Sequence, residues 1–318
     1  MRTTQRPGSN LIISCLPLIL ALALSGFFAS PTFAQDPPKP IIQTLPVGGP
    51  SSGLTFDGEN IWVVLPIEGS VNKLRDSDGV LLDIVYLDVG LTVATFDGAN
   101  IWVANGSNNT GNVTKLRASD GEILGTFRVG RVPNYILFDG ANIWTSNLVD
   151  RTLTKLRAND GTLLGTFAIP DARGIAFDGE NIWVANDYQN TVTKVLASDG
   201  SILDVVRVGN YPTNVAFDGV NIWVGASGNK VTKLLARNGR FEGQFIVDDG
   251  PGAMVSDGSN IWVTCTKHDT LAKLRIRDGS VAAVYHLHKG VFNIIFDGSS
   301  VWTTNSGADK VTKISPPR

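Results

Sequence analysis

The chain has 318 residues, of which 27 are basic and 29 are acidic, and its formal net charge is −2. This balance argues against nucleic-acid binding, which needs a basic stripe or patch. Thirty-four glycines against two methionines disfavour a helical bundle, because glycine weakens helix interiors. Seven tryptophans are a further feature that the fold has to explain.

Residues 1–34 are predicted to be a secretory signal peptide. The segment begins with a short basic part and continues with the apolar residues 11–24. Thr32-Phe33-Ala34 then places small residues at the −3 and −1 positions of a cleavage site. The apolar part is too short for a membrane span and contains Pro17. We therefore expect residues 35–318 to be exported to the periplasm, the cell surface or the medium, with no membrane span.

The two cysteines are expected to form no disulfide. Cys15 falls within the predicted signal peptide, where its surroundings loosely match a lipoprotein box that lies too early in the apolar stretch. Cleavage leaves Cys265 as the single cysteine, so the exported chain must be stabilised by packing.

After a short linker at residues 35–40, one unit of about 40 residues is repeated seven times. An Asp-Gly pair recurs seven times, from Asp57-Gly58 to Asp297-Gly298, and a tryptophan follows each pair. A fixed period of this length is typical of repeat architectures. The seven tryptophans are Trp62, Trp102, Trp144, Trp183, Trp223, Trp262 and Trp302.

Each unit is predicted to contain four short strands, A to D. In the fourth unit they are expected at residues 174–177, 182–186, 191–196 and 202–208, where Val, Ile, Thr, Phe and Trp dominate. Asp-Gly and Asn-Gly pairs between strands provide the positive φ that tight hairpins need. The pattern predicts an all-β fold, a seven-bladed β-propeller of four-stranded antiparallel blades covering residues 41–318.

The two ends of the chain predict how the ring closes. The seventh unit stops after its strand C at residues 312–314, whereas residues 40–48 have the pattern of a strand D without a unit. We expect the N-terminal strand to complete the last blade, which removes the exposed edge that an open sheet would leave.

The repeated segments IWVAN, TVTKL and LGTF-x-VG resemble the bacterial YVTN-type and NHL-like propeller repeats over nearly all of residues 35–318. A more distant similarity is to the streptogramin lyase (virginiamycin B lyase) group, which also has seven blades. The resemblance implies the propeller fold. These families include lyases, lactonases, surface proteins and binding modules, so it implies no single activity.

The repeated side chains are predicted to be structural. The tryptophans on strand B should pack between neighbouring blades. A lysine also recurs once in every strand C, and we expect its stem to pack on the next blade and its ammonium to pair with a turn aspartate. These lysines are Lys73, Lys115, Lys155, Lys194, Lys233, Lys273 and Lys313.

Recognition is expected on one of the two faces of the ring. The A–B and C–D turns share a face, and their sequences are copied from blade to blade. The B–C and D–A loops share the other face and differ in length and residue type, which suits selective binding. In blades three to five these loops carry aromatic and amide side chains that could hold a peptide, a glycan, a polar small molecule or a protein partner. The predicted ligand-binding residues are Asn134, Tyr135, Arg173, Asn186, Tyr188, Tyr211 and Asn214.

An exported, monomeric binding module without cofactor or catalysis is therefore the main hypothesis, and two alternatives stay open. One is a metal-dependent lyase or lactonase that uses His268 and His288, with Asp269 as a further candidate and a divalent ion as cofactor. The lyase resemblance implies a histidine base with a glutamate nearby, yet Glu68 in the first blade is the only glutamate of these loops. The other alternative is a structural component of the cell envelope or surface.

Overall fold

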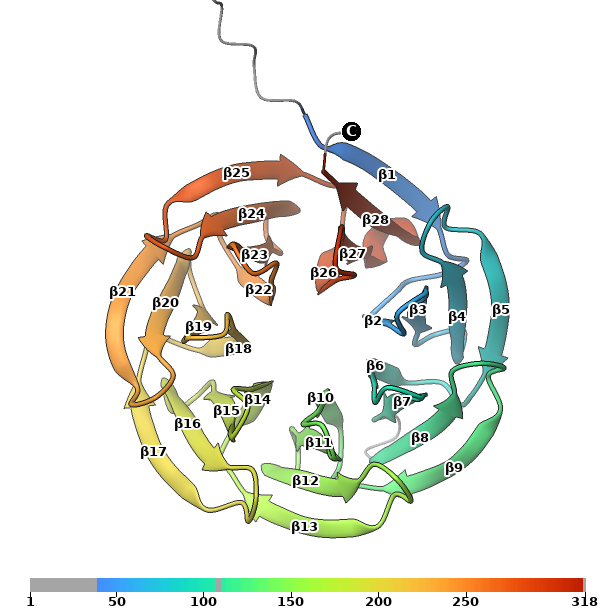
Figure 1. The fold of residues 1–318 in the computed structure, drawn as a ribbon, viewed down its shortest axis with the longest axis horizontal. Helices are drawn as coiled ribbons and strands as arrows, with labels where there is room; N and C mark the ends of the chain where they lie inside the picture. Colours follow the sequence, from blue (N-terminus) through green and yellow to red (C-terminus); the bar gives the residue numbers. More distant parts are fainter. Residues whose placement is uncertain (1–38, 107–109, 317–318) are drawn as a thin grey trace, which may run out of the picture. The chain divides into compact units, whose positions relative to one another are not determined.

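The computed structural model describes residues 39–106 and 110–316, and the predicted signal peptide lies outside these residues. Residues 39–318 form one compact unit. Within it, seven four-stranded antiparallel sheets are arranged in a ring, as Figure 1 shows. The predicted all-β, seven-bladed propeller is confirmed.

The first six blades each contain four strands that follow one another along the chain. Their order in every sheet equals their order in the sequence, so each blade is a simple meander. Blade one contains β2 (Gly53–Phe56), β3 (Asn60–Leu65), β4 (Ser70–Arg75) and β5 (Leu81–Tyr86), and blade two contains β6 (Leu91–Phe96), β7 (Asn100–Asn105), β8 (Asn112–Arg117) and β9 (Ile123–Arg128). Blade three contains β10 (Pro133–Phe138), β11 (Asn142–Asn147), β12 (Thr152–Arg157) and β13 (Leu163–Ala168), and blade four contains β14 (Ala172–Phe177), β15 (Asn181–Asn186), β16 (Thr191–Leu196) and β17 (Ile202–Arg207). Blade five contains β18 (Pro212–Phe217), β19 (Asn221–Ala226), β20 (Lys230–Leu235) and β21 (Arg240–Ile246), and blade six contains β22 (Pro251–Ser256), β23 (Asn260–Cys265), β24 (Thr270–Arg275) and β25 (Val281–His286).

The seventh blade joins the two ends of the described chain. It contains β26 (Val291–Phe296), β27 (Val301–Asn305) and β28 (Lys310–Ser315), with a short 3-10 turn at Ser306–Ala308. The outer strand of this blade is β1 (Ile41–Pro46), which pairs antiparallel with β28 from Ile41 opposite Ser315 to Pro46 opposite Lys310. The predicted closure of the ring by the N-terminal strand is therefore confirmed.

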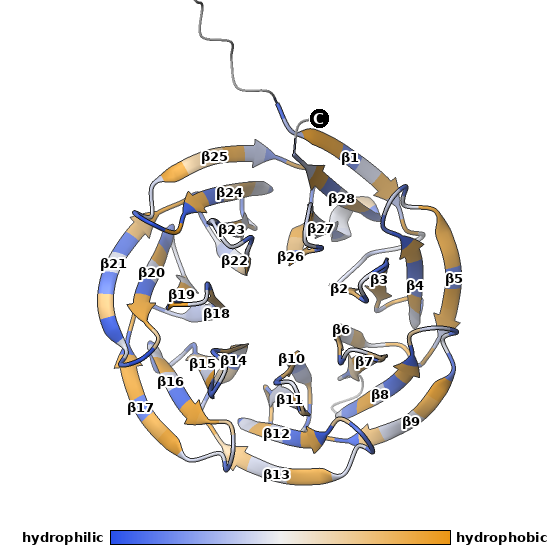
Figure 2. Ribbon diagram, in the orientation of Figure 1, coloured by the Kyte–Doolittle hydropathy of each residue, from blue (hydrophilic) through white to orange (hydrophobic). Residues whose placement is uncertain are grey.

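The outer strands carry exposed apolar residues around the ring. In Figure 2 the hydrophobic residues of β9, β13 and β17 are the orange segments of these strands. In each of the first six blades the pairing between the third and fourth strands shifts by one residue directly after the repeated lysine. Such bulges bend an outer strand and make it a poor template for pairing with another chain. No helix in the described part of the chain is long and apolar enough to cross a membrane.

Each tryptophan packs between its own blade and the next one, as the sequence predicted. Trp144 of β11, for example, lies in a buried cluster with Ile182 and Val184 of β15. Six of the seven indoles are fully buried and Trp262 is nearly so. Every indole Nε1 also donates to the aspartate of its own A–B turn at 2.7–2.8 Å, so its one polar atom is satisfied.

The repeated lysines bind the next blade, but their main partners differ from the prediction. Each ammonium lies 4.6–5.2 Å from the centre of a tryptophan ring in its own blade. At six junctions it donates at 2.7–2.9 Å to a backbone carbonyl in the C–D turn of the next blade rather than chiefly to an aspartate. Lys273 is the exception, because the seventh blade has no C–D turn, and its ammonium lies 3.8 Å from Asp257.

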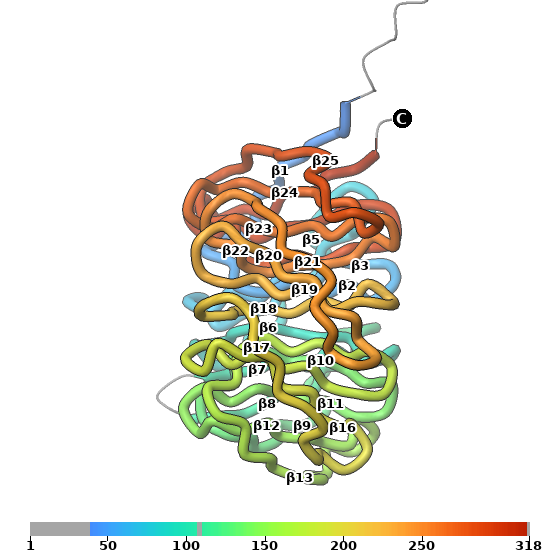
Figure 3. Tube along the Cα trace, turned by 90° about the vertical axis from the view of Figure 1, so that its left-hand side faces the viewer, coloured from blue at the N-terminus to red at the C-terminus, as the bar shows by residue number. Residues whose placement is uncertain are grey.

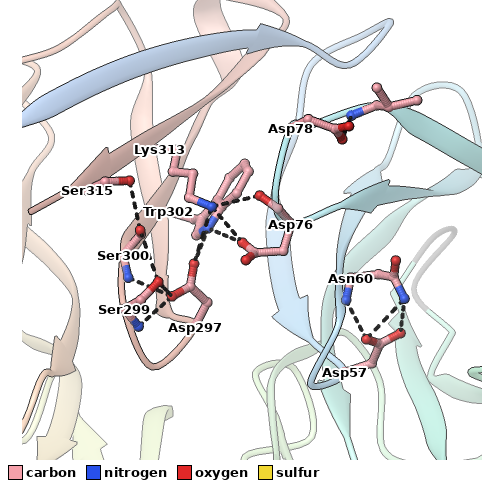
Figure 4. A network of polar contacts seen from close by, with 11 residues as sticks. Asp57, Asn60, Asp76, Asp78, Asp297, Ser299, Ser300, Trp302, Lys313 and Ser315 are labelled. Atoms are coloured by element: carbon pink, nitrogen blue, oxygen red, sulfur yellow. Dashed lines mark hydrogen bonds and ion pairs between the residues drawn. The ribbon is translucent and has the colours of Figure 1, made fainter. Parts of the chain in front are cut away.

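The junction between the seventh and first blades carries a second carboxylate, shown in Figure 4. Asp76 stands where four other blades have alanine, and its Oδ1 accepts hydrogen bonds from Lys313 at 3.0 Å and Trp302 at 3.1 Å. Asp297 accepts from the same indole at 2.8 Å. Burial, helped by the neighbouring Asp297, raises the pKa of Asp76. Although burial opposes it, hydrogen bonds from the backbone of Ser300 and Ser299 lower the pKa of Asp297. One ammonium therefore serves two carboxylates.

We expect Asp76→Asn to stabilise the ring at neutral pH. A raised pKa means that the folded state binds the proton of Asp76 more tightly than the unfolded state, so stability is lost as the pH rises through the folded pKa. Asparagine keeps the acceptor without the charge. The melting temperature at pH 7 should rise by about 1–3 °C, and the difference should vanish below about pH 4.

Asp78→Asn is the matched control, because Asp78 belongs to the same turn and its pKa is lowered, chiefly by the backbone N–H of Val80. That variant should lose stability at neutral pH relative to low pH. A melting temperature of Asp76→Asn at or below that of the unaltered protein at pH 7 would contradict the account of this junction.

Candidate functional site

The turns and loops that connect the strands lie on the two opposite faces of the ring, as the side view in Figure 3 shows. On one face the A–B turns are copies: the Asp57 carboxylate accepts the backbone N–H groups of Glu59 and Asn60, and the other six turns repeat this arrangement. On the other face, D–A and B–C loops bond to each other, as between Asp187 N and Asp171 O. The copied face is built for the scaffold, so a selective site is expected on the varied face.

A cavity of about 620 Å³ lies at the varied face, where the inner strands of the blades begin. All seven blades contribute residues to its wall, from Ser52 in the first to Phe292 and Asn293 in the seventh. This volume is within the range of cavities that bind small molecules.

Five of the seven predicted ligand-binding residues line this cavity: Asn134, Tyr135, Arg173, Tyr188 and Tyr211. They come from the starts of β10 and β14, from the B–C loop of blade four and from the D–A loop before β18. Five residues selected from the sequence of three consecutive blades therefore line the same cavity.

Asn186 and Asn214 have other positions. Asn186 is buried at the end of β15, where its Nδ2 donates to Pro170 O at 2.8 Å and its Oδ1 accepts from Thr193 at 2.6 Å. Asn214 is also buried, and it donates to the Tyr135 hydroxyl at 3.0 Å. Neither is part of the cavity wall. Asn186 holds a loop in place, and Asn214 orients a residue of the wall.

Arg173 is fixed by an aspartate that the sequence analysis did not select. Its Nε lies 2.6 Å from Oδ2 of Asp187, which follows β15 and is only 4% exposed. The other Asp187 oxygen accepts the backbone N–H of Tyr188 at 2.8 Å. Asp187 could have been found, because no other blade carries a carboxylate at this repeat position.

Tyr135 presents a protonated hydroxyl at neutral pH. Burial raises the pKa of this phenol, while the hydrogen bond from Asn214 and the positive charge of Arg173 lower it less. The hydroxyl oxygen accepts from Asn214, so its own proton remains able to donate to a ligand.

The D–A loops of blades three to five hold side chains in the left-handed region. The residue before the first strand is Gly90, Gly250 or Gly290 in three other blades, with φ of 75–86°. The equivalent residues in blades three to five are Val132, Asp171 and Tyr211, with φ of 49–55°. A side chain in this conformation costs about 1 kcal/mol or more, and such strain concentrates at functional sites. Tyr211 also meets Tyr188 edge to face, with ring centres 5.9 Å apart.

His268, Asp269 and His288, the candidate residues of the lyase or lactonase alternative, are not part of the cavity wall. Their hydrogen bonds are to residues of neighbouring loops or strand ends. Nδ1 of the exposed His268 lies 2.5 Å from Oδ1 of Asp248. The backbone of Asp269 is left-handed, and its carboxylate accepts the N–H of Gly290 at 2.7 Å. His288 is exposed, and its carbonyl accepts from Asn305 at 2.9 Å. Within residues 39–106 and 110–316 no group of three or more His, Cys, Asp or Glu could hold a metal ion.

Cys265 also contributes no reactive group. It is fully buried at the end of β23, and burial raises the pKa of its thiol to about 11. A thiol of this kind stays protonated at neutral pH and packs as a small apolar side chain.

Comparison with known proteins extends the evidence for the fold. No family model and no curated protein matches the chain. Among solved structures, "Streptogramin B lyase structure" is 18% identical with a TM-score of 0.73, and the match covers 87% of this chain and 97% of that one. "Kuenenia stuttgartiensis Hydrazine Synthase" is 16% identical with a TM-score of 0.71, and the match covers 85% of this chain and 96% of that one. The expected distant similarity to the streptogramin lyase group is confirmed for the fold, which is all that such identities show.

We expect Tyr211→Gly to be more stable than Tyr211→Ala by about 1 kcal/mol, since glycine adopts the left-handed conformation without strain. At Tyr188, whose φ is not positive, the order should be reversed, because glycine loses more backbone entropy on folding than alanine. Urea unfolding of the four variants measures both differences. Alanine as stable as glycine at position 211 would contradict the strain.

Proposed function

We propose that this protein is an exported binding module that holds a small ligand, without catalysis, in the cavity at the varied face of the ring. The observation that carries the proposal is the convergence of Tyr135, Arg173, Tyr188 and Tyr211 on one cavity of ligand-binding size. These are residues that break the repeat, whereas the copied residues are used by the scaffold.

The proposed mechanism is recognition by groups that are in place before the ligand arrives. Arg173 is held by Asp187, the Tyr135 hydroxyl by Asn214, and Tyr188 by the ring of Tyr211. Because a ligand need not order these side chains, less of the interaction free energy is lost to conformational entropy. A ring closed by its N-terminal strand supports this preorganisation.

The wall also favours binding over the lyase or lactonase alternative. A catalytic histidine has to reach the bound substrate, and neither His268 nor His288 is part of the cavity wall. Among the described residues of the cavity wall, Asp187 is the one carboxylate, and it is paired with Arg173. The proposal therefore assigns the cavity to recognition.

A fragment library tested by ligand-observed NMR on residues 35–318 is expected to give hits that compete for one site. Replacing both Tyr188 and Tyr211 by alanine should weaken these hits about tenfold or more, since two aromatic contact surfaces are lost. Tyr86→Ala is the control, because Tyr86 is at least as exposed as either tyrosine but lies on the outer strand β5. Hits that bind the double variant with the same affinity as the unaltered protein would refute the assignment of this cavity as the binding site.

A further inference from the structure

We infer that the cavity selects amphipathic organic acids, with a carboxylate bound by Arg173 and Tyr135 and an apolar body directed toward blades six and seven. This inference rests on the proposed function and narrows its ligand to a chemical class.

The polar and apolar groups of the wall are unevenly distributed. Blades three and four provide Tyr135, Arg173 and Asp187, together with the amide of Asn134. Blades six and seven lie across the channel from them in Figure 1 and provide the apolar residues Pro251, Ala253 and Phe292. The same blades also contribute the polar residues Thr266, Lys267 and Asn293. Phe292 is 52% exposed, a large apolar area for a ring beside a cavity. A ligand that satisfies both sides needs a polar head and an apolar body.

The guanidinium of Arg173 has free donors in a fixed orientation. Its Nε is committed to the buried Asp187, and no hydrogen bond joins either Nη to another described residue. The side chain is 32% exposed and lines the cavity. An arginine fork held by one nitrogen presents its other donors to a planar group with two oxygens, the geometry of a carboxylate.

The hydrogen-bonding groups around Arg173 further restrict the head group. Each Asp187 oxygen already accepts a hydrogen bond, one from Arg173 and one from the N–H of Tyr188. The Tyr135 oxygen accepts from Asn214 and leaves its proton to be donated. The corner formed by Arg173 and Tyr135 therefore offers several free donors, both Asp187 oxygens already accept a hydrogen bond, and the amide oxygen of Asn134 is the acceptor that remains on this side. A sugar hydroxyl has to donate as well as accept, whereas a carboxylate only accepts, so the corner fits the carboxylate better.

The electrostatics of the wall allow a second carboxylate beside Asp187. The positive charge of Arg173 extends to the phenol of Tyr135, where it opposes the effect of burial on the pKa. Lys267 of blade six adds a second cation to the wall and is paired at 2.8 Å with the half-buried Asp249. A carboxylate bound in this corner would thus meet one guanidinium and one phenol proton, whereas the ammonium of Lys267 belongs to blade six on the other side of the wall.

The test compares three acids with their neutral amides: 4-phenylbutyrate, cyclohexylacetate and octanoate against the corresponding carboxamides. Titration of residues 35–318 at neutral pH, followed by calorimetry or NMR, should show at least one acid binding about tenfold more tightly than its amide. Arg173→Gln should abolish this preference, and Tyr135→Phe should reduce the affinity for the acid several-fold. Arg131→Gln is the control, because Arg131 pairs with Asp150 outside the cavity wall.

Equal affinity for acid and amide, a preference that survives in Arg173→Gln, or no acid binding up to about 10 mM would overturn the inference. If the amides bind as tightly as the acids and lose affinity when Tyr188 and Tyr211 are replaced, the proposed binding function stands and only the preference for a carboxylate head group is refuted. A library in which no compound depends on these tyrosines would refute the proposed function itself.

Discussion

The fold depends on one contact, repeated at every junction between blades: an indole buried against the next blade, with its N–H bound to a turn aspartate and a lysine above its ring. Burial of each indole contributes about 3 kcal/mol in transfer free energy. The aspartate and the lysine add direction, because they fix how the indole lies and bind the next blade through its C–D turn at six of the seven junctions. With no intrachain disulfide expected, this contact and the closing strand β1 hold the ring together.

This arrangement explains why the two faces differ. The aspartate that binds each indole belongs to an A–B turn, and six of the lysines bind a C–D turn, so these turns keep a similar geometry from blade to blade. The B–C and D–A loops take no part in that contact and can differ. In blades three to five they carry Val132, Asp171 and Tyr211 in a conformation that three other blades give to glycine. A scaffold with seven copies of a buried indole can accommodate this local strain beside the cavity.

Most of the fold could be predicted from the sequence, and the candidate site only in part. The spacing of the tryptophans determines the blade count, and the lone strand before the first unit indicates closure. Cavity residues could be proposed because they depart from the repeat. The roles of Asn186 and Asn214 could not, because the partner of a strand amide (backbone, side chain or solvent) depends on packing that a repeat pattern does not encode. Asp187 differs, because its carboxylate departs from the repeat and so could have been selected from the sequence, whereas its burial against Arg173 could not.

The lysine partners show a further limit of the sequence. A recurring lysine and a recurring aspartate suggest an ion pair, yet the ammonium usually reaches a carbonyl of the next blade, because the aspartate is already used by the indole and by two backbone N–H groups. Only at the ring closure, where Asp76 replaces a small residue, does the lysine also meet a carboxylate at 3.0 Å. Which of two complementary groups is already occupied depends on the three-dimensional neighbourhood.

The central claim is that the varied face binds a ligand in its cavity, and crystallographic fragment screening of residues 35–318 tests it most directly. The account predicts that bound fragments concentrate in this cavity, with their oxygen atoms toward Arg173 and Tyr135 and their apolar parts toward Phe292. Fragments that leave the cavity empty and gather on the copied face or on the outer strands would contradict it.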